Sequence, residues 1–465
     1  MAHFRATVAT YTNMHKLSAF VTGLCLTGLM THVCAAPTRP VEQFIDAYKK
    51  TYAELGLGGD LDLSYVKNIA NLLQHTDVVQ QHRALDDLDR QFKSLDASTA
   101  SACQHLQLQQ IAFELDLNQQ KLALLDKYLA LGNQAVLSDK GLASTIMGKE
   151  WYAYLRKSWL TMDTTPEALM AMGQAELDRA LGRYRTLQAH MGYAGRDKDF
   201  AAYLSGPDSR YPEGATPQAD YEARQATVYR NLHKLFLPSA VKPPQIRQSD
   251  RGPDFPADGY YEPDQTTFYF NKGKDGFKRR NIDWLLLHES TPGHHFQHYY
   301  ALEQRGCPTD LPHQFYSAYA EGWGAYVEEF GSELGLFQTD ADELGAVEWN
   351  MVRSIRVVLD VGINQLGWSE AQAHAFWQSQ LPMLPSLAER EITRVRNWPV
   401  QAITYKLGAV MLRQLRAAAQ AREGASFDIR VFHDRVLKNG AVPLAMLADM
   451  VQGSEPPQAT VPAFK

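Results

Sequence analysis

Hydrophobic residues recur at helical spacing along most of the chain. Between residues 41 and 131 they form one stripe that ends before a glycine: Leu106, Ile111, Leu115, Leu122, Leu125 and Leu129. Further helix starts are indicated at Thr165, which precedes Pro166, and at Ser369, where Gln372 completes a capping box. We also expect a helix over 314–336, and two helices over 387–422 that break at Trp398-Pro399. The pattern therefore predicts a mainly α protein.

Residues 204–266 have a different character, because prolines, glycines and aspartates are frequent there and favour loops. Within this stretch 221–236 has the pattern of another helix. Residues 266–270, Thr-Thr-Phe-Tyr-Phe, are the best strand candidate. This small β element precedes the predicted helix that carries His288 and Glu289. It is equally consistent with an isolated edge hairpin and with a strand that holds an extended substrate by β-addition.

The N-terminal segment 1–35 is predicted to be a signal peptide. Arg5 and Lys16 precede an apolar run over 17–30, and small residues follow at 33–36. Cleavage after Ala35 leaves 36–465 as one helical domain; Met14 is an alternative start, and an uncleaved anchor is the alternative interpretation. No later segment is long and apolar enough to span a bilayer, so we expect a periplasmic or secreted protein without stable membrane insertion.

Composition and charge indicate which kinds of partner the protein can bind. The chain has 465 residues, of which 45% are hydrophobic and 21% charged, as in ordinary soluble globular proteins. Residues 1–35 hold two of the 46 basic residues and no acidic residue, so the remainder has 44 basic against 52 acidic residues, a net charge of −8. No basic block exceeds 278–280, which disfavours a nucleic-acid partner. Beyond the signal, Cys103 and Cys307 could form one disulfide or remain two buried thiols.

The chemistry centres on 285–300, LLLHESTPGHHFQHYY. An apolar run leads into His288-Glu289, the way many zinc hydrolases present a ligand beside a base. Proline occupies position 292, where an HExxH helix has its second histidine, so the helix must kink or bulge there. If Pro292-Gly293 loops out, His294 takes the position of that second ligand. His295 would return to the same face only about 10 Å further along an unbroken helix, so it is better placed to support a ligand or to bind substrate than to bind the metal.

An acidic residue is the expected third ligand. Glu321 follows His294 by 27 residues, across a short loop, so two antiparallel helices can bring it to the metal. Glu328 lies on the same face and could orient a histidine, although a solvated acidic face explains Glu328 and Glu329 equally well.

These motifs resemble the bacterial DUF885 family, which is similar to the helical HExxH zinc peptidases. The likeness covers roughly 140–420 and rests on HExxPGHH, on AEGWxxYxE from Ala320, on Gly148-Lys149-Glu150-Trp151-Tyr152, and on WPVQAITYKLG from Trp398. It implies a large helical metallopeptidase-like domain with a deep cleft, holding one Zn²⁺ per chain. Its implied site residues are His288, His294 and Glu321 as ligands, Glu289 as general base, Tyr405 as oxyanion donor, and Arg394, near Glu391, as a binder of substrate carboxylate.

The sequence departs from the family pattern at two positions that concern the substrate: Val400 replaces a usual glycine, and Val395 a common tyrosine. The resulting hypothesis is a zinc metallopeptidase that cleaves short or unfolded peptides. Its alternatives are a non-catalytic metal- or peptide-binding protein of the same fold, and a hydrolase of a non-peptide amide. A serine hydrolase is disfavoured because no GxSxG frame occurs.

Overall fold

The structure is a computed structural model that describes residues 40–57, 78–132 and 140–452, except 99, 256, 275, 305, 308–310 and 312–315. The predicted signal peptide lies outside the described residues. The described part is 70% helix and 4% strand, which confirms the mainly α prediction. Within it, every helix is too short or too polar to cross a membrane.

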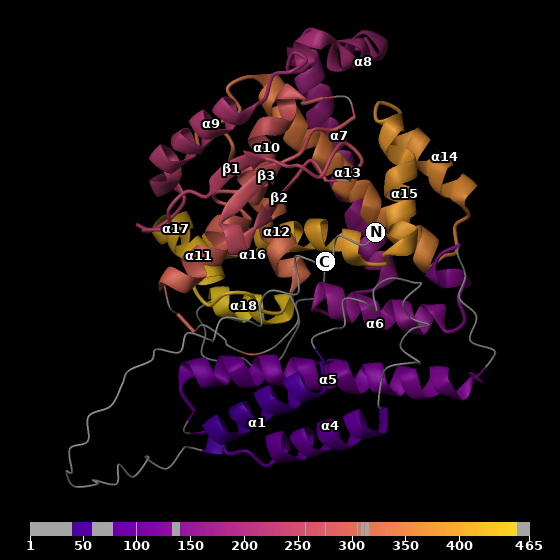
Figure 1. The fold of residues 1–465 in the computed structure, drawn as a ribbon, viewed down its shortest axis with the longest axis vertical. Helices are drawn as coiled ribbons and strands as arrows, with labels where there is room; N and C mark the ends of the chain where they lie inside the picture. Colours follow the sequence, from indigo (N-terminus) through magenta and orange to yellow (C-terminus); the bar gives the residue numbers. More distant parts are fainter. Residues whose placement is uncertain are drawn as a thin grey trace, which may run out of the picture.

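Three N-terminal helices form a layer at the lower edge of Figure 1: α1 (Pro40–Glu54), α4 (Val78–Lys93) and α5 (Ala102–Ala130). α6 (Gly148–Leu160) packs on α5 and joins this layer to the rest of the molecule. Ser101 and Gln104 cap the start of α5 reciprocally. The predicted leucine stripe of α5 is buried apart from Leu129, which is 41% exposed.

A disulfide joins Cys103, at the start of α5, to Cys307, 204 residues later. It fixes the N-terminal layer to the segment that follows α11 (His294–Gln304). Of the two alternatives for these cysteines, the structure therefore has the disulfide.

Two long helices pack against each other through the centre of the upper part: α7 (Pro166–His190) and α13 (Asp340–Asn364). Thr165 caps α7 as predicted, accepting a hydrogen bond from the backbone of Ala168. Gly173 lets the two helices approach closely, because a Cβ there would lie 2.9 Å from Cβ of Val357.

A second close pair is α12 (Ser317–Val327) with α16 (Thr404–Glu423). At their crossing two glycines face each other, and a Cβ on Gly322 would lie 2.5 Å from the Cα of Gly408. Only glycine permits this approach. Because Glu321 and Tyr405 flank the crossing, the glycine pair brings these two predicted site residues into the same region.

The sheet has three strands in the order β1-β3-β2: β1 (Gln245–Gln248), β2 (Gly259–Glu262) and β3 (Thr267–Phe270). The predicted strand is β3, but it pairs with β1 in parallel and with β2 antiparallel. β2 and β3 thus form a hairpin, but it is not isolated, because β1 pairs with the other side of β3 and leaves β3 no free edge for a substrate strand. The prediction placed loops where β1 and β2 lie, because both strands are short and sit among prolines.

Some of the remaining helices follow the predicted pattern, including the break at Trp398-Pro399 between α15 and α16, whereas no helix was predicted over 197–205, 429–437 or 444–452. They are α8 (Asp197–Ser205), α9 (Gln218–Asn231), α10 (Ile282–Glu289), α14 (Glu370–Gln380), α15 (Ala388–Asn397), α17 (Ile429–Leu437) and α18 (Leu444–Gln452). The helix expected over 314–336 ends earlier, since α12 gives way to a 3-10 turn at Glu328–Phe330.

Candidate metal centre

The helix that carries His288 breaks at the predicted position. α10 ends at Glu289, α11 begins at His294, and the Thr291–Pro292 peptide between them is cis. Gly293 packs on the end of α10 so tightly that a Cβ would lie 1.8 Å from the carbonyl oxygen of His288. The Trp323 indole donates to the Pro292 carbonyl oxygen at 2.8 Å and secures the break. The break thus replaces the continuous HExxH helix.

This break places His294 beside His288, with ring centres 4.7 Å apart and planes at 84°. Glu321 from α12 completes a group of three: its Oε2 lies 3.4 Å from Nε2 of His288 and 3.3 Å from Nε2 of His294. One ligand atom from each residue lies within 4.8 Å of the others. The side chain of His288 is 5% exposed, whereas those of His294 and Glu321 are 18% and 17% exposed, so the group is reached from their side.

Glu328 lies behind His288 and accepts a hydrogen bond from Nδ1 at 2.7 Å. It is buried, and its other oxygen accepts a hydrogen bond from Arg353. The interpretation of Glu328 as part of a solvated face is wrong, although it holds for the half-exposed neighbour Glu329. This carboxylate orients the ring so that Nε2 of His288 is directed at Glu321, as outer carboxylates do at zinc sites.

Gly324 has no side chain and therefore leaves room for the His288 ring. A Cβ at this position would lie 2.6 Å from Cε1 and 2.8 Å from Nδ1 of His288. Because α12 brings its backbone this close to the ring, it limits the orientations open to His288.

The electrostatic surroundings of these three residues favour the binding of a cation. Burial alone would lower the pKa of His288, but its hydrogen bonds with Glu321 and Glu328 raise that pKa to about 10. Burial alone would raise the pKa of Glu321, but hydrogen bonds from His288 and His294 hold it well below its usual value. The Glu321 and Glu328 carboxylates thus favour positive charge on His288. Two imidazole nitrogens and a carboxylate oxygen are a zinc ligand set that leaves a fourth position open, so these residues fit Zn²⁺.

The predicted base and oxyanion donor lie next to this group. Glu289 follows His288, is 9% exposed, and its carboxylate has no hydrogen-bond partner among the described residues. The Tyr405 ring stacks near that of His288, with centres 6.3 Å apart. Burial and the charge of Glu321 raise the pKa of Tyr405, so its hydroxyl stays protonated and able to donate.

Arg394 contacts Tyr405. Its Nη2 donates to Oε1 of Gln401 at 2.7 Å and to the Tyr405 hydroxyl at 3.4 Å. Glu391, one turn earlier, is instead paired with Arg356 and Arg390.

His295 points away from the group. Its Nε2 donates to the Lys242 carbonyl oxygen at 2.7 Å, and its Nδ1 accepts from the Tyr261 hydroxyl at 3.0 Å. The side chain is buried, and that burial lowers its pKa to about 4. These contacts hold α11 against β2. The substrate-binding role of His295 remains a prediction that its contacts do not support.

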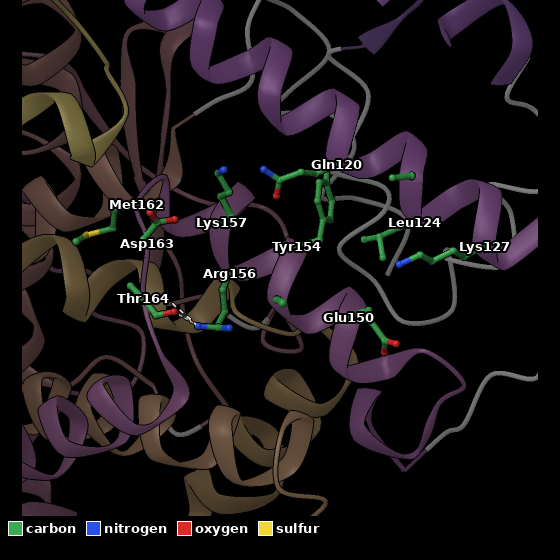
Figure 2. A pocket seen from close by; sticks show the side chains of 12 residues that line it. Gln120, Leu124, Lys127, Glu150, Tyr154, Arg156, Lys157, Met162, Asp163 and Thr164 are labelled. Atoms are coloured by element: carbon green, nitrogen blue, oxygen red, sulfur yellow. Dashed lines mark hydrogen bonds between the residues drawn. The ribbon is translucent and has the colours of Figure 1, made fainter. Parts of the chain in front are cut away.

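A hollow of about 450 Å³ lies elsewhere, between α5 and α6 (Figure 2). Gln120 and Leu124 line it from α5, and Tyr154 and Arg156 from α6. Arg156 donates to the Thr164 carbonyl oxygen there. None of the predicted site residues lines this hollow, and the deep cleft expected at the three ligands remains a prediction.

Sequence reasoning missed Arg353, which supports Glu328, and Gln401, which contacts Arg394. A signal for Arg353 was present, because 351–360 is an apolar helical run that contains two arginines and an aspartate. Charges within an apolar run are buried only with partners, so such a run indicates paired charges in the core.

Residues 33–451 match one family model, described as "Bacterial protein of unknown function (DUF885)". The chain belongs to the DUF885 family. Two solved structures share its fold. One is a "putative lipoprotein" from Colwellia psychrerythraea, 22% identical with a TM-score of 0.62, over 89% of this chain and 74% of that one. The other is a "putative lipoprotein of unknown function" from Shewanella oneidensis, 18% identical with a TM-score of 0.55, over 89% and 81%. No curated protein matches this DUF885 chain.

Proposed function

We propose that this protein is an exported zinc metallopeptidase that hydrolyses short or unfolded peptides. The observation that carries the proposal is the group of His288, His294 and Glu321 with Glu289 adjacent. A protein that only holds a metal needs no free carboxylate beside its ligands, whereas hydrolysis needs a base. Export is supported by the predicted signal peptide, by the disulfide and by the fold shared with proteins described as lipoproteins.

Each residue has a distinct task in this proposal. The two histidines and Glu321 hold Zn²⁺, with Glu328 fixing the orientation of His288. The bound ion supplies Lewis acidity toward a carbonyl and makes water acidic enough to attack near neutral pH. Glu289 takes the proton of the attacking water and passes it to the leaving amine. The Tyr405 hydroxyl donates a hydrogen bond to the oxygen that becomes negative as the carbonyl carbon turns tetrahedral.

Glu289→Gln tests the proposal, since the amide keeps the shape of the side chain but cannot take a proton. We expect the variant to keep zinc while cleavage of a mixed peptide library falls by about 10²–10⁴-fold. Glu303→Gln on α11 is the control, because Glu303 is bonded to Ser239 at the surface. Full activity of zinc-loaded Glu289→Gln would contradict the assignment of the base. Zinc binding by the wild type without any cleavage would favour a binding protein or a non-peptide amide substrate.

A further inference from the structure

The arginines behind the three ligand residues differ in how their charge is satisfied. Arg353 is paired with Glu328, and Arg356 and Arg390 share the two oxygens of Glu391. Arg394 has no carboxylate within 4.0 Å among the described residues, although it lies one turn from Glu391. It is thus the member of this group that makes no direct ion pair, although Glu391 and Glu321 are near enough to act on its charge.

The guanidinium of Arg394 also has unused donors. Its Nη2 is bonded to Gln401 and Tyr405, its Nε is buried without an acceptor, and no hydrogen bond from its Nη1 occurs among the described residues. A buried donor without an acceptor is costly. The planar fork of a guanidinium matches a carboxylate, which would satisfy the open donors and the charge together.

The position of Arg394 relates its open donors to the candidate metal centre. Its guanidinium carbon is 5.8 Å from the Tyr405 ring centre, and that ring centre is 6.3 Å from the ring of His288. These two distances limit the separation of the guanidinium carbon from the His288 ring centre to at most about 12 Å, so a substrate that reaches both has room for only one or two extended residues, at about 3.3–3.6 Å each, between them. A carboxylate on Arg394 would therefore belong to a residue just beyond the bond being cleaved.

We infer that Arg394 binds the C-terminal carboxylate of the peptide, so that the protein removes one or two residues from the C-terminal end. This inference rests on the proposed peptidase function and adds its substrate class. The same fork could accept the side chain of an acidic residue near the cleaved bond. We assign the C-terminal carboxylate because every linear peptide carries one at a fixed distance from its last bond.

The test measures binding to zinc-loaded Glu289→Gln protein by calorimetry, so it does not depend on turnover. The probes are an acetylated Ala-Ala-Ala-Phe peptide as free acid, the same peptide as C-terminal amide, and an amide with glutamate at the last position. We expect the free acid to bind about tenfold or more tightly than either amide. Adding Arg394→Gln should abolish that preference, and Arg394→Lys, which keeps the charge but not the fork, should retain part of it.

Arg396→Gln is the matched control, because Arg396 lies on the same helix and pairs with Glu370 at the surface. It should keep the full preference. Equal binding of free acid and plain amide, while the wild type still cleaves both, would overturn the inference and leave the peptidase proposal intact. Binding of the glutamate amide as tightly as the free acid would overturn the C-terminal assignment in favour of a side chain. An Arg394-dependent preference without cleavage by the wild type would support the carboxylate site while contradicting the peptidase.

Discussion

Nδ1 of His288 lies 2.7 Å from a carboxylate oxygen of Glu328, and both residues are buried. The contact extends the candidate metal centre from α10 through the turn after α12 to Arg353 on α13. Removing the charge of Glu328 should therefore weaken the metal site without touching a ligand.

We expect Glu328→Gln to lower zinc affinity by about 10–100-fold, because the amide still accepts the hydrogen bond but no longer raises the basicity of His288. Competition with a metal chelator measures the zinc affinity of each variant. Glu329→Gln is the control: Glu329 is adjacent in sequence but pairs with Arg179 and Arg413. Equal affinities of the two variants would show that Glu328 serves packing alone.

Gly324→Ala should abolish zinc binding while the protein stays folded, because the new methyl group would lie 2.6 Å from Cε1 of His288 and displace the ring. Gly182→Ala on α7 is the matched change in open space, with no atom within 4 Å of the added Cβ. It should keep the metal and stabilise the protein by roughly 0.5–1 kcal/mol. Zinc content and thermal unfolding of both variants check this, and full zinc in Gly324→Ala would contradict the assigned orientation of His288.

Much of this site could be predicted from the sequence because its constraints are local. Proline at 292 makes the helix kink or bulge, and if Pro292-Gly293 loops out His294 takes the position of the second histidine. Predicting Glu321 as the third ligand required only that the next segment form a helix. The Arg353–Glu328 contact and the open fork of Arg394 depend on how α13 and α15 pack, and spacing along the chain does not report that packing. For the same reason β1 and β2, which are stabilised by pairing with β3, were missed within a loop-rich stretch.

Val400 shows a departure from the family pattern that the backbone explains. Its φ is +70°, a conformation that glycine adopts without strain and a β-branched residue does not, so the usual family glycine suits this turn. Its side chain is nevertheless fully buried. We expect Val400→Ala to be less stable than Val400→Gly by roughly 1–2 kcal/mol, since alanine loses the packing yet keeps the Cβ clash. Urea unfolding of the two variants measures this difference. A Val400→Ala variant more stable than Val400→Gly would contradict backbone strain at Val400.

Asp360 should make stability pH-dependent. It is fully buried, and this burial raises its pKa to about 7 although Tyr152 and the Val400 backbone donate to it. Because the folded pKa exceeds the unfolded value near 3.9, the folded state binds the extra proton, and stability falls as pH rises from about 4 to about 7. Relative to wild type, Asp360→Asn should therefore gain on the order of 2 kcal/mol between about pH 5 and pH 8. Denaturant titrations at the two pH values measure this, and a difference that does not change with pH would refute it.

The most direct test of the central claim is zinc content per chain in three purified proteins: wild type, His294→Gln and His295→Gln. The two substitutions are chemically identical and adjacent, but His294 faces His288 and Glu321 whereas His295 faces Lys242 and Tyr261. We predict about one zinc in the wild type and in His295→Gln, and none in His294→Gln. Absence of zinc from the wild type after zinc is added back, or its retention in His294→Gln, would contradict the metal centre described above.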